Sequence, residues 1–167
     1  DLVSTAGDLT RERVQQVLQA QWREIGVDAR INNEPARVLF GETLPQRTYG
    51  GLAMYALISS PSNVPRAILH SEEIPTEENG FSGQNFAGYA NEEVDALLDQ
   101  LEVSFDVVER QALWERLQVV YARDLPAIPL FFRSDMHVLP KWLGGYEPTG
   151  HQSPASLWVE NWTIQSN

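Results

Sequence analysis

The chain has 167 residues, of which 43% are hydrophobic and 21% charged, the composition of a globular protein. A net charge of −11 argues against nucleic acid as a partner, because phosphate binding requires a cationic surface. The absence of cysteine excludes disulfides and thiolate chemistry, and no apolar run approaches the roughly 18 residues that a membrane span needs. The chain begins with Asp1 rather than Met, without a signal peptide, which we interpret as a processed start or a piece of a longer protein.

The N-terminal part of the chain predicts a β-α-β unit. Leu2–Ala6 is β-prone, Val27–Asn32 alternates apolar and polar residues as a half-buried strand does, and Thr10–Ile25 lies between them. The apolar positions of this middle segment have helical spacing and are expected to form its buried face: Val14, Val17, Leu18, Trp22 and Ile25. Gly26 is suited to end the helix, and a β-α-β unit favours a parallel sheet.

The middle of the chain predicts short elements separated by loops. Pro35–Leu44 predicts a short helix, because proline is tolerated in a first helical turn. Gly51–Ile58 is a continuous apolar run of strand length, which predicts a strand buried on both faces. Ser59–Pro65 has the composition of a loop, and Arg66–His70 predicts a short helical turn. The acidic segment Glu72–Gly80 is expected to be exposed.

A loop that carries two aromatic residues comes before the next helix. Phe86 and Tyr89 stand three residues apart, with Gly83, Asn85 and Gly88 around them. Small residues let the backbone approach a ligand closely, and aromatic faces provide a rigid contact surface at low entropic cost. The loop therefore predicts binding rather than catalysis.

Two amphipathic helices follow this loop. Asn91 caps a helix over Asn91–Ser104, and Asp106 and Glu109 have capping-box spacing at the start of a helix over Asp106–Arg123. The expected buried stripes are Val94, Leu97, Leu98 and Leu101 in the first helix and Leu113, Trp114, Leu117, Val120 and Tyr121 in the second. The remaining predicted elements are strands over Ala127–Arg133 and Met136–Leu139, a loop over Trp142–Pro154 and an extended segment over Leu157–Ile164.

No motif of catalytic or metal-binding spacing is present in the sequence. The three histidines lack the spacing of a zinc site: His70, His137 and His151. A G-x-S-x-G elbow, a P-loop and a G-x-G-x-x-G are all absent. Two alternatives to a binding function stay open. One is a small hydrolase using carboxylates of the Glu72–Glu78 loop, which requires two of them to face one cleft within about 10 Å. The other is a protein-interaction module with an exposed aromatic patch, formed by Trp142, Tyr146 and Trp158.

A series of segments in a fixed order resembles a known family. The segments are R-E-R-V-Q-Q-V-L-Q-A-Q-W-R-E-I-G-V-D-A-R-I (Arg11–Ile31), G-Q-N-F-A-G-Y-A-N-E-E-V-D-A-L-L-D (Gly83–Asp99), L-P-A-I-P-L-F-F-R (Leu125–Arg133), W-L-G-G-Y-E-P-T-G (Trp142–Gly150) and L-W-V-E-N-W (Leu157–Trp162). In this order and spacing they resemble the C-terminal lobe of the family 5 extracellular solute-binding proteins. These are the dipeptide- and oligopeptide-binding proteins of bacterial ABC importers.

The resemblance implies both a fold and a function. Residues 1–167 are expected to form a single α/β lobe of the type II periplasmic-binding-protein kind, with a mixed, mainly parallel sheet flanked by helices. Its partners would be a small peptide or other polar solute, the missing N-terminal lobe and the ABC permease subunits, in the periplasm after export. Binding would be reversible, without chemistry or a cofactor, and a lone lobe would bind weakly or not at all.

The resemblance also carries over the candidate binding residues. Peptide-binding relatives have a Trp-x-x-Asp-type loop whose aspartate anchors the free amino group of the peptide. Ala56 and Ser59 occupy the matching positions here, and a neutral serine cannot make a charge-assisted bond to an ammonium. A modified peptide or a different polar solute is therefore the expected ligand. The predicted site consists of hydrogen-bonding residues (Ser59, Ser60 and Asn63), an aromatic and polar wall (Asn85, Phe86 and Tyr89) and Arg133, which follows an apolar strand and can clamp a carboxylate.

Overall fold

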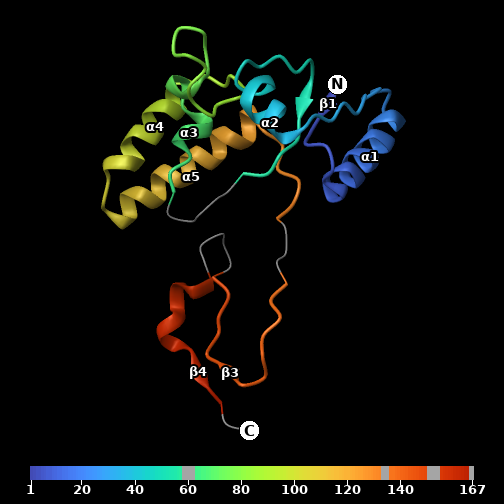
Figure 1. Ribbon diagram of the computed structural model, residues 1–167. Helices are drawn as coiled ribbons and strands as arrows, with labels where there is room; N and C mark the ends of the chain where they lie inside the picture. Colours follow the sequence, from blue (N-terminus) through green and yellow to red (C-terminus); the bar gives the residue numbers. More distant parts are fainter. Residues whose placement is uncertain (58–62, 133–135, 150–154, 166–167) are drawn as a thin grey trace. The chain divides into compact units, whose positions relative to one another are not determined.

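Residues 1–57, 63–132, 136–149 and 155–165 are described in the computed structural model (Figure 1). The chain divides into two units by its internal contacts. The first unit comprises Asp1–Ala56 and Val64–Ala127, and the second comprises Leu57–Asn63 and Ile128–Asn167. The expectation that all 167 residues form one lobe stays a prediction.

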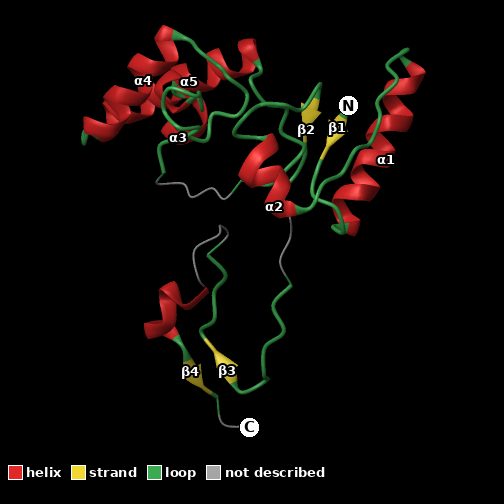
Figure 2. Ribbon diagram, turned by 45° about the horizontal axis from the view of Figure 1, so that its top comes forward, coloured by secondary structure: helices red, strands yellow, loops and turns green. Residues whose placement is uncertain are grey.

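The first unit begins with a small parallel sheet. Strand β1 (Leu2–Val3) pairs in parallel with β2 (Leu52–Ala53), and single parallel bridges join Leu2 to Ile31 and Thr5 to Glu34. Helix α1 (Leu9–Glu24) lies between β1 and the two bridge residues Ile31 and Glu34, so the first strand, the helix and the parallel direction of the pairing are confirmed. Figures 1 and 2 show α1 and α2 on opposite sides of β1.

Residues next to α1 explain where the helix begins and where it ends. The side chain of Asp8 accepts hydrogen bonds from the backbone N–H groups of Thr10 and Arg11, each at 3.1 Å, which satisfies donors that the helix leaves unpaired. At the other end Gly26 adopts a φ of +85°, where a residue with a Cβ atom would be strained, and the helix stops as predicted.

The predicted buried face of α1 is wrong at Val17 and Ile25, whereas Val14, Leu18 and Trp22 are partly buried. Val17 is 56% exposed and Ile25 is 75% exposed, whereas the buried residue of the helix is Gln15. The amide of Gln15 donates to Leu2 O at 3.1 Å and exchanges two 2.8 Å hydrogen bonds with the side-chain amide of Asn33. A polar side chain can take the inward position because its hydrogen-bonding groups are satisfied there.

The prediction of a doubly buried strand over Gly51–Ile58 is also wrong for its described part. Only Leu52–Ala53 lies in a strand, and Leu52 is exposed. Similarly, Val27–Asn32 contributes one isolated bridge rather than a strand. Both segments do take part in the parallel pairing with β1. In the described part of the chain, however, this pairing extends over fewer residues than the apolar pattern of either segment predicts.

A short helical segment covers the sheet, as predicted for Pro35–Leu44. It consists of α2 (Ala36–Val38) and the π-helical turn η1 (Leu39–Thr43). Leu39 and Leu44 are fully buried and form a cluster with Val3 of β1. The partly buried residues that pack on this sheet cluster are Tyr49, Ala53, Tyr55 and Phe86.

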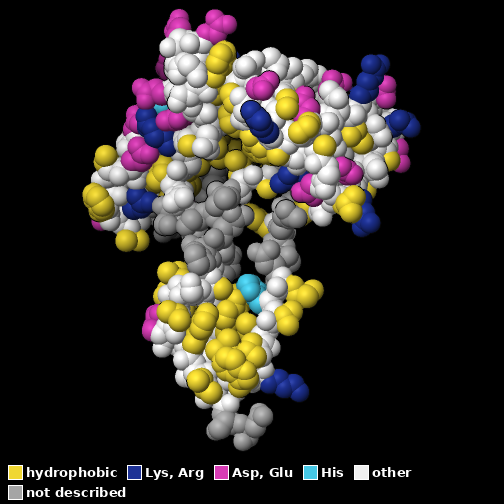
Figure 3. Space-filling model, viewed as in Figure 1, with side chains coloured by type: hydrophobic (Ala, Val, Ile, Leu, Met, Phe, Trp, Pro, Cys, Tyr) yellow, Lys and Arg dark blue, Asp and Glu magenta, His cyan; other side chains and the backbone are white. Residues whose placement is uncertain are grey.

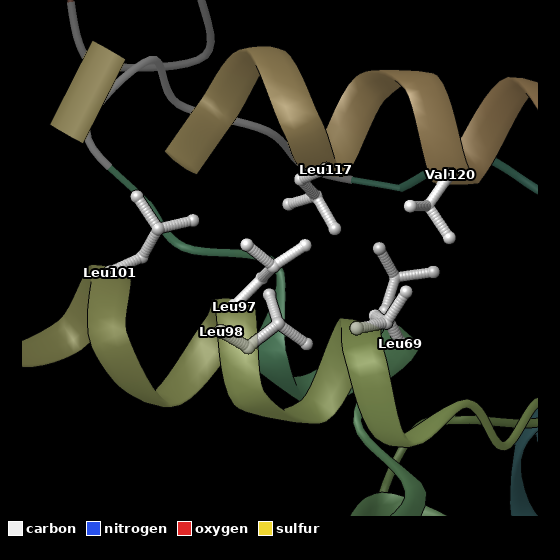
Figure 4. Close-up of a cluster of buried hydrophobic side chains, with 7 residues drawn as sticks. Leu69, Leu97, Leu98, Leu101, Leu117 and Val120 are labelled. Carbon is white, nitrogen blue, oxygen red and sulfur yellow. The ribbon is translucent and has the colours of Figure 1, made fainter. Parts of the chain in front are cut away.

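A helical cluster forms the second core of this unit. It is built from α3 (Arg66–Leu69), α4 (Glu92–Val103) and α5 (Val107–Asp124), with the 3-10 turn η2 (Ser71–Glu73) after α3. Figure 4 shows side chains of α4 and α5 facing one another, with Leu69 of α3 beside them. The buried members are Leu69, Val94, Leu97, Leu98, Leu101, Leu117 and Val120.

The predicted stripe of α4 is therefore confirmed in full, and Leu117 and Val120 are confirmed for α5. The caps are confirmed too. The side chain of Asn91 accepts from Glu93 N at 2.9 Å, and that of Asp106 accepts from Glu109 N at 2.9 Å. Glu109 accepts from the hydroxyl of Ser104, so the second bond of a capping box is replaced by a bond to the preceding helix end.

The second unit contains little regular structure. Strand β3 (Leu143–Gly144) pairs antiparallel with β4 (Thr163–Ile164), and the 3-10 segment η3 (Ala155–Asn161) precedes β4. The predicted strands over Ala127–Arg133 and Met136–Leu139 are wrong in their described residues, and most of Leu157–Ile164 is helical rather than extended. A strand needs a neighbouring strand for its backbone groups, and no strand among the described residues pairs with these segments.

Apolar side chains remain exposed on this second unit. Phe132 is 93% exposed and Met136 is 90% exposed. Figure 3 shows hydrophobic side chains over much of the visible face of the part that carries β3 and β4. Among the described residues, no helix is both long and apolar enough to cross a membrane. With helices beside a mainly parallel ladder, the described fold is α/β, as predicted.

Candidate ligand-binding surface

Asn85 organises the loop that the sequence singles out. Its side chain is fully buried, and its Nδ2 donates to His70 O at 3.0 Å and to Tyr89 O at 2.7 Å. Its Oδ1 accepts from Tyr89 N at 3.0 Å, and its backbone N–H donates to Glu73 O at 2.9 Å. Asn85 therefore supports the loop from inside, and the structure gives it no exposed atom for the solute contact that the sequence predicts.

Phe86 packs on the sheet cluster. Its half-buried ring lies edge-on to Tyr55, with ring centroids 6.1 Å apart and an interplanar angle of 66°. Its carbonyl oxygen accepts a 2.7 Å hydrogen bond from the hydroxyl of Tyr49. The part of the Phe86 ring that the core does not cover is thus held in a defined position.

Tyr89 packs on the helical cluster instead. Its hydroxyl donates to Asp124 Oδ2 at 2.7 Å, and the same oxygen accepts from Asn91 Nδ2 at 2.7 Å. Burial, together with the hydrogen bond to Asp124, raises the pKa of Tyr89 to about 12. Hydrogen bonds from Arg123, Tyr89 and Asn91 hold the pKa of Asp124 well below its ordinary value. The two predicted aromatics therefore diverge, and the loop joins the sheet cluster to the helical cluster.

A hollow of about 420 Å³ opens beside Phe86. Its lining residues are Gln46, Arg47, Tyr49, Gly51, Phe86 and Ala87. Burial raises the pKa of Tyr49, and the positive charge of Arg47 opposes this shift. The hollow thus has one cation in its lining, is open to solvent and is lined mostly by polar surface.

Arg47 has an unusual backbone. Its φ of 52° lies in the left-handed region, which costs a residue with a Cβ atom about 1 kcal/mol or more. Its guanidinium lies against Gly88, where a Cβ atom would collide with Nη1. Gly88 itself has a φ of +66°, a conformation that only glycine adopts without strain. Glycine therefore both leaves room for the guanidinium and permits this backbone conformation. Within the described residues the guanidinium of Arg47 makes no hydrogen bond or ion pair.

The other predicted site residues are placed only in part. Asn63 is exposed and belongs to the second unit. Ser59, Ser60 and Arg133 lie outside the described residues. A shared site for these residues and the loop around Asn85 stays a prediction.

Arg47 and Tyr49 were missed by the sequence reasoning. The segment Q-R-T-Y-G-G in which they stand predicts only a turn. No local pattern shows that an arginine takes a left-handed conformation or that a tyrosine bonds to a carbonyl 37 residues away. The one available signal is the pair Gly50-Gly51, which indicates close backbone packing nearby.

The two alternative functions find limited support in the geometry. The hollow at Arg47 is not lined by any residue of Glu72–Glu78, and Glu72 instead pairs with Arg66 at 2.7 Å. Trp142 and Trp158 are about half exposed, but Tyr146 packs against His137 and Trp162. Across the described part of the chain, no group of three or more acidic or histidine side chains is arranged to hold a metal ion.

Comparisons with known proteins find that the chain is similar to solute-binding proteins. No family model matches it. The chain is 25% identical over 141 residues to the oligopeptide-binding protein OppA of Bacillus subtilis (strain 168), covering 83% of this chain and 24% of that protein. It is 33% identical, with a TM-score of 0.76, to the solved structure of the oligopeptide-binding protein from Thermus thermophilus complexed with a pentapeptide. That match covers 87% of this chain and 26% of the other.

The likeness extends over the whole chain at the level of the fold. The structure of HbpA2 from Haemophilus parasuis matches 99% of this chain and 32% of its own, with a TM-score of 0.73 and 18% identity. The chain spans about a quarter of the length of the OppA and Thermus proteins. The predicted resemblance to family 5 extracellular solute-binding proteins is confirmed, and with it the type II periplasmic-binding-protein fold.

Proposed function

We propose that this chain is the C-terminal lobe of a two-lobed solute-binding protein that serves an ABC importer. The observation that carries the proposal is the 33% identity and TM-score of 0.76 to the Thermus protein, which was solved with a pentapeptide. The chain spans about a quarter of that protein, as one part of a larger binding protein would. Its remaining partners would be an N-terminal lobe of the same protein and membrane permease subunits, and its location the periplasm.

Reversible capture, rather than catalysis, suits the side chains of the first unit. The loop around Asn85 is held by buried hydrogen bonds, and it presents part of Phe86 beside the hollow at Arg47. A preorganised wall of this kind lowers the entropic cost of binding. When a second lobe closes over such a wall, water leaves and each polar contact becomes stronger.

The solute class follows from the departure at Ser59. With serine in place of the aspartate that anchors an amino group in peptide-binding relatives, a free peptide N-terminus would lose its charged partner. We therefore expect a modified peptide or another polar solute. Ser59, Ser60, Asn63, Tyr89 and Arg133 remain the proposed contacts, together with Phe86, while Asn85 acts as support.

The test is to identify what the protein carries. The longer protein that contains this chain is purified without denaturation, and mass spectrometry is used to identify the small molecules released from it on unfolding. A stoichiometric peptide or polar solute is expected. In calorimetry with that solute, the 167-residue chain alone should bind far more weakly than the longer protein. Turnover of the solute into a product, or equal affinity for the chain alone, would contradict the proposal.

A further inference from the structure

The buried side chain of His70 caps the turn η2 in a way that only the neutral ring allows. Of the two histidines that the structure describes, His137 is exposed, whereas the side chain of His70 is only 5% exposed. The Nδ1 atom of His70 accepts a 3.1 Å hydrogen bond from the backbone N–H of Glu72. Because a backbone N–H can only donate, Nδ1 carries no proton, and the neutral ring has its proton on Nε2.

Charged side chains face the ring of His70 from each element that packs on it. The Nε2 atom makes no hydrogen bond within the described residues and lies 3.4 Å from Asp99 Oδ1. A hydrogen bond from Arg66 holds the pKa of Asp99 below its ordinary value, so this carboxylate stays charged in mild acid. A protonated ring would therefore have a charged partner inside the fold. The full set comprises Arg66 of α3, Glu72 of η2, Asp95 and Asp99 of α4, and Glu102, which lies 3.6 Å from Arg66.

Protonation of the ring changes the role of Nδ1 from acceptor to donor. The atom could then no longer accept from Glu72 N, since two hydrogen atoms would face one another. The nearest carboxylate oxygens are Asp95 Oδ1 at 3.8 Å and Glu72 Oε2 at 4.0 Å, both beyond hydrogen-bond length. Asp95 Oδ1 also accepts from the backbone N–H of Ser71 at 2.9 Å. The protonated ring therefore gains a partner for Nδ1 only if η2 shifts.

The turn η2 directly supports the loop that carries Phe86. The carbonyl oxygen of Glu73 accepts from the backbone N–H of Asn85 at 2.9 Å, and His70 O accepts from Asn85 Nδ2 at 3.0 Å. Gly83 lies so close to Glu73 O that a Cβ atom there would collide with it. A shift of η2 would therefore weaken the contacts that hold this loop in place.

We propose that His70 is a pH-sensitive switch, which fixes η2 and the loop around Asn85 when its ring is neutral and loosens both when the ring takes up a proton. Histidine is the side chain that ordinarily changes its charge between about pH 5 and pH 8, so the change is expected in mild acid. The inference goes beyond the proposed solute-binding role. Its test needs no solute, and it can fail while that role stands.

The test follows the 167-residue chain by NMR as the pH is lowered. At about pH 8 the ring nitrogen shifts of His70 should show a proton on Nε2 and none on Nδ1. Between about pH 8 and pH 5, the hydrogen-exchange protection factor of the Asn85 amide should fall about fivefold or more, as expected when a hydrogen bond is lost. The chemical shifts of the Asn85 and Glu72 amides should change with the same midpoint as the ring of His70.

Two variants separate the switch from general effects of acid. In His70→Asn, the side-chain oxygen can accept from Glu72 N at every pH, so the protection of the Asn85 amide should no longer depend on acid. His137→Asn removes the exposed histidine and should retain the response of the parent chain.

The proposal is overturned if Nδ1 of His70 carries a proton at about pH 8, or if the Asn85 amide of the parent chain is equally protected at both pH values. It is also overturned if the amide shifts and the ring titrate with different midpoints, or if His70→Asn keeps the response to acid. The measurements on the parent chain decide the question even where His70→Asn fails to fold.

Discussion

Replacing Asn85 by alanine tests whether the buried side chain of Asn85 holds the loop around it in place. The substitution removes three side-chain hydrogen bonds, two to backbone oxygens and one from Tyr89 N. A buried hydrogen bond contributes about 1 kcal/mol, so Asn85→Ala should lower the free energy of unfolding by about 3 kcal/mol. That loss is a large fraction of the roughly 5–15 kcal/mol that stabilises a typical domain.

The assay is urea unfolding of the chain followed by tryptophan fluorescence, combined with hydrogen exchange of the Tyr89 amide. Asn85→Asp is the sharper variant. It keeps an acceptor for Tyr89 N but turns a buried charge toward the oxygens of His70 and Tyr89, so it should destabilise at least as much as alanine. Asn32→Ala is the matched control, because Asn32 is exposed and should change stability by no more than about 0.5 kcal/mol.

The reasoning is refuted if Asn85→Ala unfolds within about 0.5 kcal/mol of Asn32→Ala. It is also refuted if the amide of Tyr89 exchanges at the same rate in the parent chain and in Asn85→Ala. Either result would mean that the loop keeps its shape without the buried amide. Asn85 would then be free to act at the surface, as the sequence predicts.

Four further predictions concern the packing of the core, the backbone at Arg47 and the titratable groups Tyr89 and Asp124. Leu98→Ala should destabilise the chain by about 2–5 kcal/mol in urea unfolding, because Leu98 of α4 is fully buried in the helical cluster (Figure 4). Equal effects of Leu98→Ala and of the exposed control Val103→Ala would contradict this packing. Arg47→Gly should leave the midpoint of thermal unfolding unchanged or raise it, because glycine adopts a φ of 52° without strain. A clear loss of stability would show that the side chain of Arg47 contributes to the fold. The pKa of Tyr89 is raised to about 12, so the unfolded chain loses this proton first and stability should fall as the pH rises from about 10 toward 12. Tyr89→Phe should reduce that slope in urea titrations at fixed pH, and an unchanged slope would rule out the hydroxyl as its source. The pKa of Asp124 is lowered, so its stabilising contribution is present above its ordinary pKa and should disappear on acidification.

Much of the helical structure follows from the sequence alone, because helices depend on neighbouring residues. The cap at Asn91 and the stripe from Val94 to Leu101 are predicted from spacings of one turn, and the structure reproduces them. The stop at Gly26 is equally local, since it requires only a residue that tolerates positive φ. The family resemblance is also a property of the sequence, carried by segments in a fixed order.

Tertiary structure alone decided which surfaces are buried and which residues meet. The apolar spacing of α1 predicts the helix itself, yet its fully buried position belongs to Gln15, whose partner Asn33 is 18 residues away. The burial of Asn85 and the left-handed conformation of Arg47 likewise depend on contacts with distant segments. Hydrogen bonds and packing across such distances are set by the whole fold, and no window of neighbouring residues contains the information needed to predict them.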